Sequence, residues 1–203
     1  MARAGGRHIA IVQGHPDPGA RHFGHALADA YAIGAREAGR HVEVIEVATL
    51  DFPFLHSRND LESDEIPEVI RTAQSIISHC DHLLLIYPVW NGGTPAILRA
   101  FLEQTFRPHF MFPDAKAGES LGFVSALKQR KALAGKSARI VATMAMPAWV
   151  YRWYFHPHPE RNTLRLSGMN PVNESLIGLV EGADRRQREK WLRTMRQLGR
   201  EGR

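Results

Sequence analysis

The sequence predicts an α/β fold, a three-layer sandwich in which helices cover both faces of a five-stranded parallel sheet. Short apolar runs alternate five times with segments of helical periodicity, which is the pattern of parallel strands joined by crossover helices. The run at 81–87 (DHLLLIY) is almost continuously apolar, as expected of a central strand that is buried on both faces. Five such strands fit the doubly wound order 2-1-3-4-5, in which ligands bind where strands 1 and 3 end.

The first half of the chain contains three of the predicted strands. β-Branched residues dominate the run at 8–13, and apolar and polar residues alternate at 41–47. Apolar residues recur at helical spacing within 23–39 and again within 66–80. We therefore expect two helices there, the first ending at its final glycine, between strands at 8–13, 41–47 and 81–87.

The second half is predicted to be less regular, with longer connections between its elements. A helix is expected at 97–106, followed by an irregular segment at 108–137 that holds a short helix near 125–131. A strand at 138–144 comes next, and the connection 145–173 holds at most a short helix around 161–168. The chain then forms a strand at 174–180 and a helix at 184–199. The aromatic residues concentrated in the long connections are unusual for solvent loops and draw attention to them as sites.

Length and composition indicate one globular domain over residues 1–203. The chain is 44% hydrophobic and 23% charged, close to globular averages. It has no run of 18 apolar residues and no hydrophobic leader, so we expect neither a transmembrane segment nor a signal peptide. A single cysteine, Cys80, excludes an internal disulfide and a cysteine-based zinc site, and we expect a cytoplasmic location.

The formal net charge of +5 is concentrated at the C-terminal end and in a second basic run at 128–136. A basic end can bind nucleic acid or an anionic surface, or it can be the solvated face of a packed helix. Trp191, Met195 and Leu198 recur at helical spacing and give the last helix a buried side. We therefore favour the solvated helix and expect no nucleic-acid partner.

Two short motifs match known catalytic sequences but lack their structural context. Gly118 to Gly122 (GESLG) matches the serine-hydrolase elbow, yet no strand precedes it and no histidine follows in the required order. Gly135-Lys136-Ser137 resembles the end of a phosphate-binding P-loop, but it precedes a strand instead of following one. Neither motif supports hydrolase or nucleotide-triphosphate chemistry.

The loop after the first strand, residues 14–23 (GHPDPGARHF), opens the first helix with Arg21 and His22 at its start. Cations are unfavourable at a helix N-terminus, whereas the free N–H groups and helix dipole there attract a phosphate. A bound anion would reverse the penalty. The alternative is a tight turn with exposed polar residues.

The loop after the central strand, residues 88–95 (PVWNGGTP), combines paired glycines with Trp90. Glycines let a flat ligand approach the backbone closely, and the indole offers an aromatic surface. The same residues also fit an ordinary turn in which Thr94 caps the next helix and Pro95 starts it. The two interpretations are compatible.

Aromatic residues crowd the segment 143–158 (TMAMPAWVYRWYFHPH), which indicates a lined pocket or an interface, the alternative being a core role alone. Phenylalanines 106, 110 and 112 with Trp149 and Trp153 exceed what a small sheet needs, so we expect a two-fold dimer that buries part of this set. The histidines at 22, 25, 156 and 158 lack the cysteine or carboxylate partners of a metal site, and we expect no metal.

Together these segments resemble the flavodoxin-like NAD(P)H:quinone oxidoreductases, the DT-diaphorase-like group. The resemblance covers about residues 7–180. The segments on which it rests are IVQGHPDP with HFGHALADAY, LLLIYPVWNGGTPAILRAFLEQTF, and GKSARIVATMAMP with YRWYF. It implies a flavodoxin-like fold, bound FMN or FAD, hydride transfer from NAD(P)H to a quinone or similar acceptor with ping-pong kinetics, and a homodimer. The alternative is a flavodoxin-like regulatory subunit that binds a partner protein.

Carried over position by position, the resemblance places the flavin against three loops. The implied contacts are His15, Arg21, His22 and Phe23 in the first loop, Pro88, Val89, Trp90, Asn91, Gly92 and Gly93 in the second, and Thr143, Met144, Ala145 and Met146 in the third. Two departures are His22 in place of a hydroxyl residue and methionines where the family often has glycines. The family's proton donors map onto Tyr151 and His156, with His158 or water as alternatives.

Overall fold

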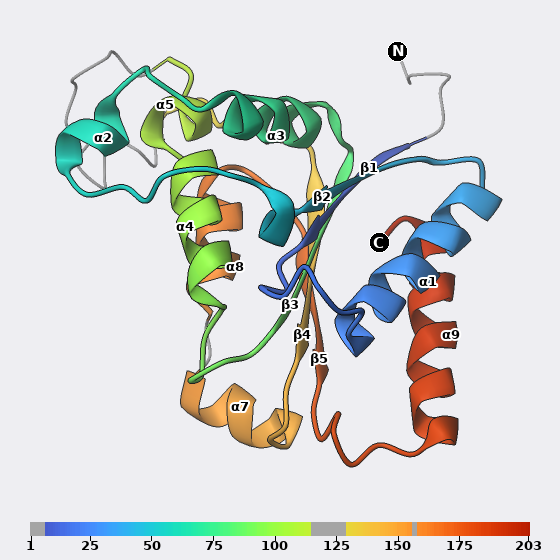
Figure 1. The fold of residues 1–203 in the computed structure, drawn as a ribbon. Helices are drawn as coiled ribbons and strands as arrows, with labels where there is room; N and C mark the ends of the chain where they lie inside the picture. Colours follow the sequence, from blue (N-terminus) through green and yellow to red (C-terminus); the bar gives the residue numbers. More distant parts are fainter. Residues whose placement is uncertain (1–6, 115–128, 156–157) are drawn as a thin grey trace.

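The computed structural model describes residues 7–114, 129–155 and 158–203, and its centre is one parallel sheet. The strands are β1 (His8–Gln13), β2 (His41–Glu46), β3 (His82–Pro88), β4 (Ser137–Thr143) and β5 (Val172–Ile177). Their order is β2-β1-β3-β4-β5, and every neighbouring pair is parallel (Figure 1). This confirms the predicted α/β flavodoxin-like sandwich and its strand order.

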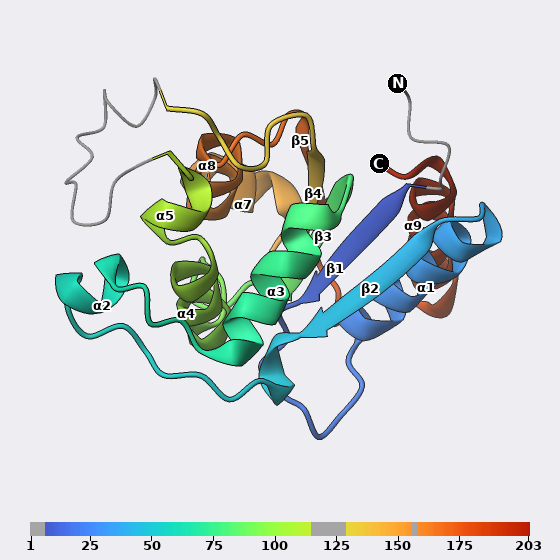
Figure 2. The same cartoon turned by 90° about the horizontal axis from the view of Figure 1, so that it is seen from above.

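Helices cover both faces of the sheet. On one face lie α1 (Phe23–Glu37) and α9 (Arg185–Glu201), and on the other lie α3 (Glu68–His79), α4 (Ala96–Thr105) and α8 (Pro159–Leu166) (Figure 2). Shorter pieces are η1 (Val47–Thr49), α2 (Arg58–Glu62), α5 (Pro108–Met111) and α7 (Ala148–Phe155). The last of these lies at the end of the sheet where the strands finish, at the bottom of Figure 1.

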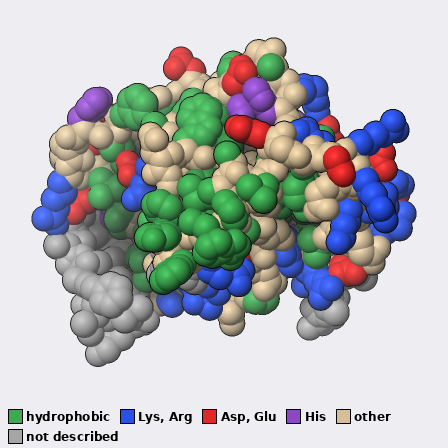
Figure 3. All heavy atoms as spheres, turned by 90° about the horizontal axis from the view of Figure 1, so that it is seen from below, with side chains coloured by type: hydrophobic (Ala, Val, Ile, Leu, Met, Phe, Trp, Pro, Cys, Tyr) green, Lys and Arg blue, Asp and Glu red, His purple; other side chains and the backbone are tan. Residues whose placement is uncertain are grey.

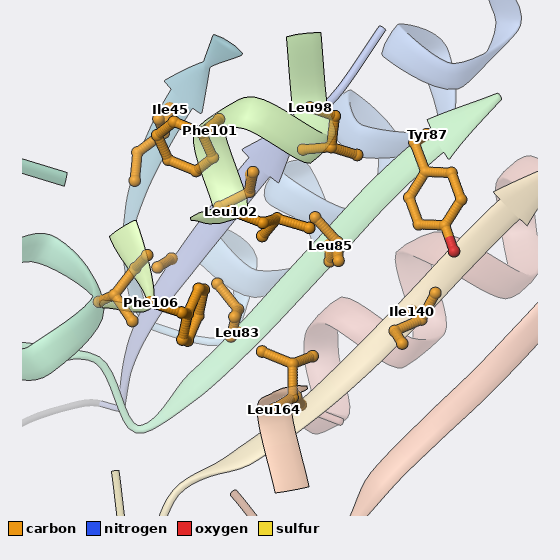
Figure 4. Packing of buried hydrophobic residues seen from close by; sticks show 14 of the residues in the cluster. Ile45, Leu83, Leu85, Tyr87, Leu98, Phe101, Leu102, Phe106, Ile140 and Leu164 are labelled. Carbon is orange, nitrogen blue, oxygen red and sulfur yellow. The ribbon is translucent and has the colours of Figure 1, made fainter. Parts of the chain in front are cut away.

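The sheet separates two hydrophobic cores because alternate side chains of each strand point to opposite faces. Leu84 of β3 packs under α1 and α9, whereas Leu83 and Leu85 pack against the other helices. Figure 4 shows Phe101 and Phe106 lying over this second face. All six buried residues from 82 to 87 are at most 1% exposed, as predicted for a central strand.

Helices α1 and α9 meet through glycines. A Cβ atom on Gly34 would lie 1.9 Å from the carbonyl oxygen of Arg196, and one on Gly199 would lie 2.0 Å from that of Tyr31. No side chain fits at either position, so the backbones pack directly. The contact fixes α9 on the sheet, with Trp191, Met195 and Leu198 on its inner side as predicted. Its arginines 196 and 200 pair with Glu37 of α1.

Several predicted boundaries are wrong, most clearly for the last strand. It spans 172–177 instead of 174–180, because Gly178 packs against the backbone at 146–148 and Leu179 has φ of 56°. Helix α7 lies in the connection that was expected to hold only one short helix. The short helix predicted near 125–131 and the GESLG motif fall largely or wholly outside the described residues, and 129–131 are not helical. Among the described helices, none is long and apolar enough to cross a membrane.

Candidate active site

Three loops meet where β1, β3 and β4 end, at the switch point of the strand order. The Val89 N–H donates to the carbonyl oxygen of Thr143 (2.7 Å), which joins the second loop to the third. The rings of His15 and Trp90 meet edge to face with centroids 6.3 Å apart, which joins the second loop to the first. The structure therefore brings together the three segments that the sequence singled out.

The first loop is held by its own side chains. The His15 N–H donates to Gln13 Oε1 (3.0 Å), the Asp17 N–H to His15 Nδ1 (3.2 Å) and the Gly19 N–H to Asp17 Oδ1 (2.8 Å). The loop encloses a cleft of about 120 Å³, closed on its other side by residues 46–49. Gln13 Nε2 is buried in the wall of this cleft with no hydrogen-bond partner. A buried donor of this kind favours an acceptor in the cleft.

Two of three neighbouring histidines, His15 and His25, line the cleft. His15 stacks on His22 with centroids 3.8 Å apart, and His25 lies 5.5 Å from His15. Burial, and next the positive potential of the two neighbouring imidazoles, lowers the pKa of His15 to about 4. His22 Nε2 lies 2.8 Å from Asp17 Oδ2, and this hydrogen bond is the main reason that the pKa of Asp17 is lowered.

The other predicted residues of the first loop are oriented differently. The Arg21 guanidinium borders the cleft but donates to Asp29 on α1, in an exposed ion pair. The Phe23 ring faces α9, with Trp191 at a centroid distance of 5.8 Å and the Arg188 guanidinium 5.4 Å above it. His15 and Arg21 are therefore the predicted residues that line the cleft, His22 stacks on His15 without lining it, and the lining residues His25 and Gln13 were missed.

The second loop is a two-residue hairpin turn. Trp90 and Gly93 exchange backbone hydrogen bonds of 2.9 Å, and Asn91 and Gly92 between them have φ of 48° and 79°. Positive φ at both central positions is the type I′ turn that Asn-Gly favours. Trp90 is 52% exposed beside it. A Cβ atom on Gly92 would lie 2.3 Å from the Phe155 ring, so the glycine lets α7 pack on the turn.

Thr94 does not cap the following helix as predicted. The N-cap residue of α4 is Pro95, and the Thr94 hydroxyl instead donates to Oε1 of Glu160 on α8 (3.2 Å). Arg99 Nη1 lies 3.7 Å from the same oxygen. This buried carboxylate ties the base of the second loop to α8. No feature of the sequence indicated this contact, because Glu160 follows Pro159 in a first helical turn, where an exposed acid is common.

Only part of the third loop faces outward. Thr143 and Met144 are buried, Met146 is half-buried, and Ala145 alone of the four is exposed. Ala145 borders a wide groove of about 690 Å³ whose other wall is formed by residues 178–184 and Trp191. Any flat ligand at this loop would therefore meet the backbone and the Ala145 methyl group before the methionines.

The two predicted proton donors are placed unequally. Tyr151 is 1% exposed, stacked between Phe155 (5.4 Å) and His158 (4.7 Å), and burial raises its pKa to about 12. His156 lies outside the described residues. His158, the alternative, is itself buried. The sequence did not reveal this burial because α7 was not predicted. Both assignments stay predictions.

Large apolar side chains lie exposed around the second loop and α7, on the face seen in Figure 3. We call this set the aromatic surface: Trp90, Trp149, Trp153, Tyr154, Phe155 and Leu179, exposed by 41% to 75%. Phe106 and Phe112, by contrast, are buried within the chain, so the prediction that they exceed the needs of one sheet is wrong. Among the described residues, no three histidine, cysteine or acidic side chains are grouped to hold a metal ion.

Comparisons with known proteins agree with this architecture. A family model described as a flavodoxin-like fold matches residues 7–198. A Haemophilus influenzae protein named as an uncharacterized NAD(P)H oxidoreductase is 30% identical over 117 residues, 56% of this chain and 57% of its own length, so the chain spans about half of that relative. An NAD(P)H:quinone oxidoreductase from Methanothermobacter marburgensis superposes with a TM-score of 0.74 at 18% identity, covering 96% of this chain and 95% of its own. An FMN-dependent NADH-azoreductase from Bacillus anthracis, in complex with FMN, gives 0.67 at 12% identity, with 97% and 100% covered.

Proposed function

Since this chain belongs to the flavodoxin-like fold family, we propose that it is a flavin-dependent oxidoreductase that passes a hydride from NAD(P)H to a quinone-like acceptor. The observation that carries the proposal is the junction of three loops at the switch point, where a donor-lined cleft adjoins an exposed tryptophan turn. The names of the relatives support the same chemistry.

The cleft of the first loop is where the flavin phosphate would bind. Gln13 Nε2 supplies a buried donor, the imidazoles of His15 and His25 line the same space, and His22 stacks on His15. A phosphate dianion would favour the protonated form of the His15 imidazole, so it would oppose the burial that lowers the pKa of His15. Arg21 would add charge by leaving Asp29, which is a weak exposed partner.

The second and third loops would hold the ring system. The turn at 90–93 presents backbone N–H groups and the exposed Trp90, and Ala145 leaves room on the other side. A flavin held by these loops would supply the chemistry of hydride transfer between NAD(P)H and the acceptor. The protein's part is to orient the ring, exclude water with the aromatic surface and hold a proton donor nearby.

We assign Tyr151 and His156 as the donors of the proton that reduction of the acceptor requires. A phenol whose pKa is raised to about 12 stays neutral at working pH and donates a hydrogen bond without ionising. The half-exposed Phe155 ring stacks on Tyr151 and lies between this phenol and solvent on one side of the proposed site. A second copy of the chain would cover the aromatic surface and complete the wall of the site.

The first test is spectroscopic. The purified chain is reconstituted separately with FMN and with FAD, and the bound flavin is followed by its visible absorbance. A yellow protein that oxidises NAD(P)H with quinones and gives parallel double-reciprocal lines supports the proposal. A colourless protein that rejects both flavins identifies a regulatory subunit instead, and intersecting lines overturn the ping-pong mechanism.

A second test addresses the phosphate end. The change Arg21→Ala with His22→Ala should weaken flavin binding roughly ten- to a hundred-fold, since charge-assisted contacts contribute about 1.5–3 kcal/mol. Arg71→Ala, an exposed arginine on α3, is the matched control. Unchanged flavin affinity in the double variant would overturn the assigned side-chain contacts.

A further inference from the structure

A cluster of buried polar side chains lies at the opposite end of the sheet from the three loops, between the sheet and the helices α1 and α9. Leu84 of β3 and Val141 of β4 belong to the core under these helices. His82 and Arg139 each precede one of them by two residues, so they point to the same face. The ring of Tyr31, from α1, lies 6.3 Å from that of His82 and almost parallel to it.

Each of these three side chains has a buried polar atom without a hydrogen-bond partner. The atoms are His82 Nε2, the Tyr31 hydroxyl oxygen and Arg139 Nε. His82 and Tyr31 are 0% exposed and Arg139 is 9% exposed. Arg139 acts electrostatically on both Tyr31 and His82, which places the three groups together. Unsatisfied polar groups buried in one place are costly unless something between them accepts their hydrogen bonds.

All three groups can donate at once. His82 Nδ1 lies 2.8 Å from Ser137 Oγ. When the serine hydroxyl donates to Nδ1, the histidine carries its proton on Nε2 and presents a donor. Burial raises the pKa of Tyr31, so its hydroxyl keeps its proton. Arg139 already donates from Nη1 to Ser175 Oγ (2.8 Å), which leaves Nε–H available.

The charge around the cluster is strongly positive. Arg7 donates to the Gly202 carbonyl (3.1 Å) and Arg40 to that of Arg200 (2.9 Å), at the C-terminal end of α9. Among the described residues, Arg7, Arg40 and Arg139 form no salt bridge with a carboxylate. Glu201, an acid whose charge acts on Arg139, is itself paired with Arg203. The side-chain hydrogen bonds of Arg7, Arg40 and Arg139 thus go to neutral partners, and Glu201 acts on Arg139 without a salt bridge to it.

We propose that His82, Tyr31 and Arg139 form a binding site for a small monovalent anion of chloride size, enclosed between the sheet and the helices α1 and α9. The three donors require the bound ion to be negative, because a cation would meet only N–H and O–H groups and the positive charge of a guanidinium. Their nearly complete burial sets the size, since a polyatomic ligand would force the core apart. A water molecule would satisfy the hydrogen bonds but would bring no negative charge to the buried Arg139 guanidinium, on which Glu201 acts without a salt bridge.

The site differs from the cleft of the first loop in every residue and lies at the other end of the strands. It would hold α9 to the sheet near the C-terminal end of the helix, where Figure 1 places the end of the chain beside β1. The role is structural: the anion neutralises the buried guanidinium of Arg139, which forms no salt bridge with a carboxylate among the described residues.

The solution test compares chloride with gluconate at constant ionic strength. The full chain is melted over a series of chloride concentrations, and the rise in Tm gives the half-saturating chloride concentration. We expect this concentration to increase about tenfold or more in Arg139→Met and roughly threefold or more in Tyr31→Phe, which removes only a hydroxyl. Arg186→Met, an exposed arginine on α9, should match the parent. An equal chloride response in the parent and both cluster variants would overturn the proposal.

The crystallographic test uses bromide in place of chloride. Anomalous difference density within hydrogen-bond distance of His82 Nε2 and Arg139 Nε would support the site, and its loss in Tyr31→Phe crystals would tie it to the third donor. Ordinary water density with no anomalous signal, or no density at all, would overturn it. Since Tyr31→Phe keeps the ring and its packing, this variant remains informative if Arg139→Met does not fold.

Discussion

The α1/α9 side of the molecule and the loop end of the sheet use opposite kinds of side chain at their contacts. Where α1 crosses α9, glycines allow backbone atoms to touch, and little apolar surface remains exposed. Around the second loop and α7, tryptophans, a tyrosine and a phenylalanine lie in solvent. Both regions pack against the same five-stranded sheet.

This difference suggests that the α1/α9 contact serves the stability of the fold, whereas the aromatic surface serves function. Where backbone atoms touch directly there is no room for an added atom, so a substitution at the α1/α9 contact should lower the stability of the fold. The most exposed rings of the aromatic surface, Trp153 and Tyr154, contribute little to folding, because most of their area stays in water. Contiguous exposed apolar side chains mark a surface that something else covers. Changes on the two sides should therefore alter different measurements.

The largest effect is expected at the glycine contact. Gly34→Ala places a methyl group against the Arg196 carbonyl oxygen, and backbone cannot move aside as a flexible side chain does. We expect the free energy of unfolding to fall by about 3 kcal/mol, measured by urea denaturation. Gly24→Ala, on the same helix with open space around it, is the control and should not destabilise. Equal stability of the two variants would show that the helices separate easily.

Acid should destabilise the α1/α9 side through His82. Burial first, then the positive charges of Arg139, Arg7 and Arg40, lower its pKa to about 3 in the folded state. In the unfolded chain, His82 binds its proton near pH 6.5. The contribution of the neutral, buried His82 to the free energy of unfolding is therefore fully present above that pH and is lost as the pH falls below it. Between neutrality and pH 5 the loss should be about 2 kcal/mol.

His82→Gln should flatten this part of the pH profile, because glutamine does not titrate. The measurement is urea unfolding of the two proteins at pH 7, 6 and 5 in gluconate buffer, which excludes chloride from the comparison. Parallel profiles for parent and variant would assign the acid sensitivity to other groups.

A smaller effect on stability is expected at the turn. Gly92→Ala forces a non-glycine residue to a φ of 79° and pushes its methyl group against Phe155. We expect a stability loss of about 1 kcal/mol and a larger relative loss of flavin affinity, by roughly tenfold. Gly93→Ala, where an added Cβ meets open space, should have the smaller effect on both. Titration of each variant with FMN and FAD distinguishes a strained turn from a lost contact.

The smallest effect on folding is expected on the aromatic surface. Trp153 is 75% exposed, so Trp153→Ser should change the free energy of unfolding by no more than about 0.5 kcal/mol. If a second copy covers this surface, the same variant should shift the protein from dimer to monomer in light scattering at micromolar concentration. Parent protein that is already monomeric would refute the dimer.

The sequence alone predicted the order of the five strands and indicated that the three loops lie together at one end of the sheet. Alternation of strand and helix and the apolar run at 81–87 constrain the topology, because parallel strands require crossover helices. It was not sufficient for α7. That helix (AWVYRWYF) is aromatic on nearly every side, so no amphipathic period marks it, and its burial of Tyr151 could not be inferred.

Tertiary structure alone decided how individual side chains are used. Thr94 could cap a helix or reach a distant acid, and only the position of α8 places Glu160 within 3.2 Å of its hydroxyl. Phe112 could cover a sheet or a partner, and only folding buries it within the chain. The buried cluster of His82, Tyr31 and Arg139 joins three separate elements. Local periodicity determines which elements form, whereas contacts between residues far apart in sequence depend on how those elements pack.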